Sequence, residues 1–180
     1  MQRISPQNNP QGKAAELLNN VKRSLGSTPN MFTTMANSPA LLEGYLGLNS
    51  SLAGGALPTK VREQIALTVA GANGCDYCAS AHTFLGEKAG VNETDANLKG
   101  RSNDVKTQAA LNFAKSLVEQ RGRVADSDLQ ATRDAGYSDE EILEIIGAVA
   151  LNTLTNYFNE AVKTEIDFPK ICAQGCRLAA

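Results

Sequence analysis

Apolar residues along this chain recur at spacings of three and four rather than two, and short breaks rich in Gly, Pro, Asn or Ser separate the apolar runs. Spacings of three and four place side chains on one face of an α-helix, whereas a half-buried strand alternates apolar and polar residues. In residues 13–25, for example, Leu17 and Val21 lie one turn apart, and the run ends at Gly26. The pattern predicts an all-α fold.

Capping residues and chain breaks set the expected bounds of the helices. Ser38 followed by Pro39 combines a cap residue with a first-turn proline. Pro58 begins a helix that breaks at the glycine-containing stretch 71–74, and Asn92 is the expected cap of a short helix. These signals predict a short helical turn or loop at 29–32 and helices at 38–54, 58–70, 75–89, 92–98 and 104–118.

Two later helix starts are predicted from capping-box spacing, in Ser127 with Gln130 and in Ser138 with Glu141. The last helix is the most apolar, because residues 142–154 carry apolar side chains around more than one stripe. A helix of this kind lies at the centre of a core or in a subunit interface. Tyr157 and Phe158 are likewise expected to pack in the core or an interface.

Length and composition fit a single-domain helical bundle. The 180 residues are 42% hydrophobic and 20% charged, with a formal net charge of -2, values of ordinary globular proteins. We divide the chain into an extended polar segment at 1–12, a helical domain at 13–169 and a tail at 170–180. The scattered basic residues argue against nucleic-acid binding. Without a secretory signal or a membrane-spanning run, the protein is expected to be cytoplasmic.

The residue types of a redox site gather in GCDYCASAH at 74–82, which holds two of the four cysteines and the only histidine. If a helix begins near Cys75, then Cys78 and His82 follow at i+3 and i+7 on the same face. The first turn of a helix favours thiolate over thiol, and thiols there can have pKa values of about 3.5 to 7.5. Such a dithiol can be oxidised to a disulfide near neutral pH.

Thiol oxidation also needs groups that move protons, and His82 and Glu63 are the candidates. Glu63 lies twelve residues before Cys75, on the preceding predicted helix. The break at 71–74 allows that helix to fold back beside the cysteine helix. Because Glu63 is surrounded in sequence by apolar residues, partial burial is expected to raise its pKa and make it a base near pH 7.

Two other uses of these side chains are open. Cysteines spaced three apart on an apolar helix can be inert buried hydrophobes. Zinc is a second alternative, with ligands drawn from Cys75, Cys78, His82, Cys172 and Cys176. The tail pair is C-x3-C without a zinc-knuckle pattern, so no metal is expected. The tail pair is either a second exchange pair or incidental. No nucleotide or flavin motif is visible, so no bound cofactor is expected.

The positions of Glu63, Cys75, Cys78 and His82 form the pattern E-x11-C-x2-C-x3-H. This pattern resembles that of the AhpD-like alkylhydroperoxidases in the carboxymuconolactone decarboxylase superfamily. The similarity extends from about residue 10 to 169, and it includes Leu57-Pro58, Asn156-Tyr157-Phe158-Asn159 and Thr164-Glu165-Ile166-Asp167-Phe168-Pro169, which look like the peroxidase-related branch.

The resemblance implies an all-helical fold assembled as a homo-oligomer, a trimer or hexamer, and a thiol-dependent peroxidase. In that family the residue matching Cys78 attacks the hydroperoxide and becomes a sulfenic acid, and the one matching Cys75 condenses with it to a disulfide. The residues matching Glu63 and His82 relay protons through water. A lipoylated protein regenerates the dithiol in the best-known members, and a peroxiredoxin can be a further partner.

One position departs from the resemblance. The best-known members carry another histidine just before the second cysteine, where this chain has Tyr77. A phenol forms hydrogen bonds but does not release and take up a proton near pH 7. The identities of the hydroperoxide and of the reductant therefore stay open. The alternative functions are a general thiol-disulfide oxidoreductase and a redox-sensing oligomer without turnover. Lactone decarboxylation is disfavoured because it does not depend on such a dithiol.

Overall fold

The computed structural model describes residues 1–175, and these contain nine helices and no strand, which confirms the all-α prediction. The helices are α1 (Gly12–Leu25), α2 (Asn30–Met35), α3 (Pro39–Ala53), α4 (Thr59–Asn73), α5 (Asp76–Lys88), α6 (Thr94–Asn97), α7 (Val105–Glu119), α8 (Asp126–Asp134) and α9 (Asp139–Val162). Within the described part of the chain, no helix combines the length and the apolar content that crossing a membrane requires.

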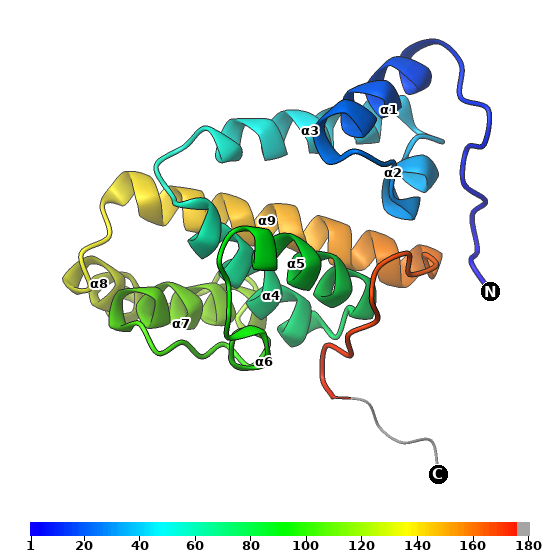
Figure 1. Cartoon of the computed structure of the whole chain (residues 1–180). Helices are drawn as coiled ribbons and strands as arrows, with labels where there is room; N and C mark the ends of the chain where they lie inside the picture. Colours follow the sequence, from blue (N-terminus) through cyan, green and yellow to red (C-terminus); the bar gives the residue numbers. More distant parts are fainter. Residues whose placement is uncertain (176–180) are drawn as a thin grey trace.

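The long helix α9 runs through the middle of the molecule, with α1 to α3 on one side and α7 and α8 on the other (Figure 1). Two clusters of buried apolar residues fill the space between the helices. One joins α1, α2, α3, the start of α5 and the C-terminal segment, and the other joins α4, α7 and α9. Helix α4 contributes Leu67 to the first cluster and Ile65 to the second, so it is fixed between them.

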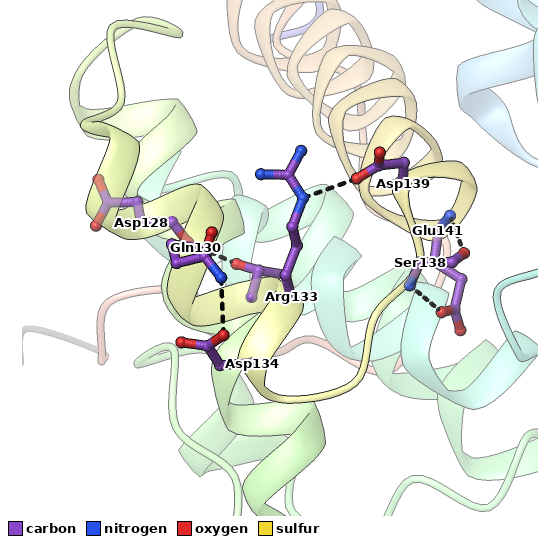
Figure 2. A network of polar contacts seen from close by, with 8 residues as sticks. Asp128, Gln130, Arg133, Asp134, Ser138, Asp139 and Glu141 are labelled. Carbon is purple, nitrogen blue, oxygen red and sulfur yellow. Dashed lines mark hydrogen bonds and ion pairs between the residues drawn. The ribbon is translucent and has the colours of Figure 1, made fainter.

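Two predicted caps are present at the helix starts, and a third helix begins with a cap at Asp104, its predicted first residue. Ser38 accepts a hydrogen bond from the Leu41 amide at 3.3 Å and begins α3. Ser138 and Glu141 form the predicted capping box of α9, with bonds of 3.1 Å and 2.8 Å (Figure 2). Asp104 caps α7 through a 2.7 Å bond from the Thr107 amide. These caps satisfy amides that have no partner within the helix.

Two predicted caps are wrong. Helix α8 begins before Ser127, because Asp128 accepts a hydrogen bond from the Ala125 amide at 3.1 Å and closes the first turn from there. Gln130 instead donates to Asp134 within the helix (Figure 2). Helix α6 begins after Glu93 rather than at Asn92. The Glu93 carboxylate is bound by the side chains of Gln64 and Ser102 and the amide of Asn103.

Two glycines shape the connection between α4 and α5. A Cβ on Gly71 would lie 1.9 Å from the carbonyl oxygen of Leu98, so only glycine permits this close packing against the chain after α6. Gly74 has a φ of 70°, a left-handed conformation that ends α4 and turns the chain. Its neighbour Cys75 donates its amide to the Ala70 carbonyl at 3.0 Å. The break therefore folds α5 back beside α4, as the site requires.

The last helix is central, as the sequence suggests, but it also exposes apolar side chains. Phe158 packs against the first core cluster, whereas Tyr157 is 64% exposed. Tyr157 therefore does not belong to the core of the single chain. Of the two expected environments for Tyr157, only an interface between chains is left as a prediction.

Candidate functional site

The two motif cysteines lie in contact at the start of α5. Cys75 is the residue that caps the helix, and its sulfur accepts a hydrogen bond from the Cys78 amide at 3.3 Å. The two sulfur atoms are 2.8 Å apart, with the Cys75 thiol donating to Cys78. Both side chains are free thiols and are buried, at 0% and 2% exposure. The prediction that a helix begins near Cys75 is confirmed.

Glu63 and His82 form an ion pair beside the dithiol. The Glu63 Oε2 atom lies 2.8 Å from His82 Nδ1, and both side chains are mostly buried. Glu63 comes from the second turn of α4 and His82 from the middle of α5. The fold-back at Gly74 thus brings together all four residues named from the sequence.

The dithiol is electrostatically asymmetric. The hydrogen bond from Cys75 is the main cause that lowers the pKa of Cys78 to about 7, against the opposing effect of burial. The charge of His82 and the amide of Asn159 lower it further. The pKa of Cys75 is raised, because its thiol proton is held by Cys78 and its side chain is buried. Of the two thiols, Cys78 is therefore the one that ionises near neutral pH, while Cys75 stays protonated.

His82 supplies a positive charge to this site. Burial alone would lower the pKa of its imidazole, but the charge and hydrogen bond of Glu63 outweigh that effect, and the pKa is raised above its ordinary value. The neighbouring Cys78 thiolate acts in the same direction. The arrangement places an imidazole that can donate a proton beside the site, and the Glu63 carboxylate favours its charged form.

Asparagines of α9 complete the site, and the sequence analysis assigned them no role. Asn159 donates its side-chain amide to the Cys78 sulfur at 3.3 Å. Asn156, one turn earlier, accepts a 2.9 Å hydrogen bond from Asn73 at the end of α4. A signal was present in the sequence, because Asn152, Asn156 and Asn159 recur at helical spacing on the most apolar helix. Buried polar side chains on such a helix require partners.

A cavity of about 530 Å³ opens onto the reactive side of the site. Cys78, His82 and Glu63 all line it, whereas Cys75 is not among the described residues that do. The cavity is also lined by apolar and aromatic side chains from α2, α3, α5, α9 and the C-terminal segment: Met31, Phe32, Tyr45, Phe84, Leu151 and Phe168. Of the two cysteines, a molecule in this cavity would therefore meet Cys78.

The sequence of this region matches a known family model. Residues 39–101 match the carboxymuconolactone decarboxylase family, a range that contains Glu63, Cys75, Cys78 and His82. A comparison with curated proteins finds no match.

Solved structures show the same fold over most of the chain. A peroxidase-related protein from Ralstonia eutropha JMP134, described as an alkylhydroperoxidase AhpD core, is 24% identical with a TM-score of 0.76, covering 90% of this chain and 92% of that one. A peroxidase-related protein from Silicibacter sp. TM1040 is 20% identical with a TM-score of 0.79, covering 91% of each chain. The debrominase Bmp8, bound to 2,3,4-tribromopyrrole, is 23% identical with a TM-score of 0.77 and covers 91% of each chain.

The chain therefore has an AhpD-like fold, and its residues 39–101 match the carboxymuconolactone decarboxylase family. Helices α3 to α6 form the part that the family model covers, with the dithiol near its centre.

Tyr77 has a structural position in this fold. Its hydroxyl accepts a hydrogen bond from the Met31 amide at 3.1 Å and donates to Asp167 at 2.9 Å. The ring lies edge-on to Phe168, and burial raises the pKa of the phenol, so it stays neutral. Tyr77 thus joins α5 to α2 and to the C-terminal segment, and it does not replace the family's histidine as a proton carrier.

We expect Tyr77→Phe to lower the free energy of unfolding by about 1–3 kcal/mol, because it leaves the buried Met31 amide without its partner. Urea unfolding followed by circular dichroism measures this change. Tyr137→Phe is the matched control, since Tyr137 is equally buried and its hydroxyl makes no hydrogen bond to residues 1–175. Equal stability of the two variants would contradict the role given to Tyr77.

The C-terminal segment of the AhpD-like chain runs along the start of α5. The Ile171 amide donates to Ser80 and the Ala173 amide to Asp76, each at 2.9 Å. Cys172 is half-buried in this segment, and Cys176 lies outside the described residues. The second exchange pair therefore stays a prediction. Within residues 1–175, no three His, Cys, Asp or Glu side chains gather in a group that could hold a metal ion.

Proposed function

We propose that this protein is a thiol-dependent peroxidase that reduces hydroperoxides with the Cys75–Cys78 dithiol. The main support is the asymmetry of the two cysteines. Cys78 has the lowered pKa and lines the cavity, and the Cys75 sulfur lies 2.8 Å from the Cys78 sulfur. A nucleophile that meets the substrate and a second thiol in contact with it are the two parts that the cycle needs.

The cycle balances in three steps. The Cys78 thiolate attacks the outer oxygen of the hydroperoxide, the O–O bond breaks, and the leaving alkoxide takes a proton to become an alcohol. The Cys75 thiol then attacks the Cys78 sulfenic acid, water leaves, and a disulfide forms. An external dithiol reduces this disulfide and is itself oxidised to a disulfide.

His82 and Glu63 are proposed to move the protons of this cycle. The imidazolium of His82 donates to the leaving alkoxide, and Glu63 at 2.8 Å stabilises its charge before the transfer. Water in the cavity is proposed to complete the relay.

The environment of the enzyme is part of the same proposal. We propose a lipoylated protein as the external dithiol and a peroxiredoxin as a further electron acceptor, in a cytoplasmic homo-oligomer, trimeric or hexameric. Two neighbours with this fold are described as peroxidase-related, which supports the reaction class.

Mass measurement before and after one equivalent of cumene hydroperoxide tests the proposal. We expect the reduced protein to lose two hydrogens on the peptide that contains Cys75 and Cys78, and dihydrolipoamide to restore both thiols. Catalytic consumption of the peroxide in the presence of dihydrolipoamide should follow. Thiols that stay reduced after the peroxide treatment would overturn the proposal.

Reductive dehalogenation is the second candidate, and the apolar, partly aromatic cavity beside a nucleophilic thiolate favours it. Bmp8, which shares the fold, is a debrominase solved with 2,3,4-tribromopyrrole. In such a reaction a carbon–bromine bond becomes carbon–hydrogen, bromide is released, and the dithiol is oxidised to the disulfide. Ion chromatography of bromide released from 2,3,4-tribromopyrrole, with dihydrolipoamide present, separates this activity from peroxide reduction.

A further inference from the structure

Four polar side chains of α9 are buried along the face that packs toward α4 and α5. Asn152, Thr155, Asn156 and Asn159 are 8%, 4%, 0% and 2% exposed. Burying an amide or hydroxyl without a hydrogen-bond partner is unfavourable. The contacts of these side chains divide them into two kinds.

Asn152 and Thr155 each donate a hydrogen bond within their own helix, and Asn152 also forms a side-chain hydrogen bond that raises the pKa of His82. Asn152 donates to the Ala148 carbonyl at 2.8 Å, and Thr155 donates to the Asn152 carbonyl at 2.9 Å. Such bonds are an ordinary way for a helix to satisfy a buried polar side chain.

Asn159 instead directs its amide across the helix interface to the dithiol, and Asn156 lies three residues before it on the same helix. Asn159 Nδ2 donates to the Cys78 sulfur at 3.3 Å. Asn73 Nδ2 donates to Asn156 Oδ1 at 2.9 Å, which fixes the orientation of the Asn156 carboxamide. Asn156 Nδ2 is buried and has no partner among the described residues. One donor in contact and one spare donor thus lie by a single sulfur.

We propose that Asn159 is a catalytic residue that holds Cys78 as a thiolate, that Asn156 is a second donor to the same sulfur, and that Asn73 positions Asn156. Hydrogen bonds to an ionised acceptor are stronger than bonds to a neutral one, and they strengthen where water is excluded. Both amides therefore favour the thiolate over the thiol. In agreement, the amides of Asn159 and Asn156 each contribute to the lowered pKa of Cys78.

The proposal rests on the proposed function in taking Cys78 as the nucleophile, but its test does not require turnover. Alkylation of Cys78 by iodoacetamide, followed by peptide mass analysis, measures the thiolate fraction as a function of pH. The wild-type midpoint is expected near pH 7. Since the thiolate is the reactive form, the alkylation rate should rise with pH through this midpoint.

Asn159→Leu removes the donor at similar side-chain volume, and we expect the midpoint to rise by about one to two pH units. Asn159→Asp should raise it further, because an acceptor with negative charge then faces the sulfur. Asn156→Leu should produce a smaller rise. Unchanged midpoints in folded Asn159→Leu and Asn159→Asp would overturn the proposal.

Asn73 is expected to act only through Asn156. Asn73→Leu should raise the midpoint slightly, and the Asn73→Leu/Asn156→Leu double variant should match Asn156→Leu alone. Additive shifts in the double variant would overturn the positioning role of Asn73.

The charged and titratable groups around the dithiol stay in place in the Leu variants. They are Cys75, Tyr77 and His82 on α5, Glu63 on α4, Tyr45 on α3 and Glu160 on α9. Thr132→Val on α8 is the matched control, because it removes one buried hydrogen bond, to the Asp128 carbonyl, in another part of the fold. It should lower thermal stability and leave the midpoint at the wild-type value.

The failures of the two proposals are distinguishable. If the midpoints shift as expected but no hydroperoxide is consumed, the role of the asparagines is supported and the peroxidase function is wrong. If hydroperoxide is consumed while Asn159→Leu keeps the wild-type midpoint, the peroxidase function is supported and the role of the asparagines is wrong.

Discussion

Cys78→Ser is expected to abolish hydroperoxide consumption, whereas Cys75→Ser should allow one slow turnover that stops at the sulfenic acid. A serine hydroxyl is not ionised near pH 7, so the first variant has no nucleophile facing the cavity. The second variant keeps Cys78 but lacks the thiol that lies 2.8 Å from it in the native site. The sulfenic acid then has no neighbouring thiol to condense with.

A peroxide assay combined with trapping of the sulfenic acid by dimedone measures both outcomes. We expect dimedone to label Cys78 stoichiometrically in Cys75→Ser and not to label Cys78→Ser. Equal residual activity in the two variants would contradict this division of roles. Cys172→Ser is the matched cysteine variant outside the motif, and loss of activity in it would show that the tail takes part.

Much of the fold and part of the site were predictable because they depend on local sequence. Apolar spacing sets the helices, and Ser38, Asp104 and Ser138 bind amides three residues away. Cys75 and Cys78 also interact within one turn. The glycine break at 71–74 is a local signal as well, and it is enough to predict that Glu63 returns to the cysteine helix.

The contacts that were missed join residues far apart in sequence. Asn159 reaches Cys78 across 81 residues, and Tyr77 reaches Asp167 across 90. The packing of α9 and of the C-terminal segment against α5 decides these contacts, and no single helix carries that information. The wrong prediction that Ser127 caps α8 has a local cause instead. Ser127 and Asp128 are neighbouring residues that can both accept a hydrogen bond at a helix start, and it is Asp128 that binds the Ala125 amide, so the helix begins earlier.

Glu63→Gln is expected to lower the peroxidase rate at pH 7 by about 10²–10⁴-fold, the usual contribution of a general acid–base group. The substitution keeps the shape of the side chain and removes its charge. Burial would then dominate at His82 and lower the pKa of the imidazole, since Glu63 is what raises it against burial. The uncharged imidazole would neither donate a proton to the leaving alkoxide nor stabilise the Cys78 thiolate.

The sign of the pH dependence follows from the same charges. Loss of the His82 charge should raise the pKa of Cys78 from about 7, so the acid limb of the pH–rate profile should move to higher pH. Turnover measured from pH 5 to 9 with cumene hydroperoxide and dihydrolipoamide gives both the rate at pH 7 and the pH at which the acid limb lies. Glu87→Gln, the same substitution at an exposed position of α5, should leave both unchanged. If Glu63→Gln keeps the wild-type pH–rate profile, the Glu63 carboxylate takes no part in the proton relay and His82 acts without it.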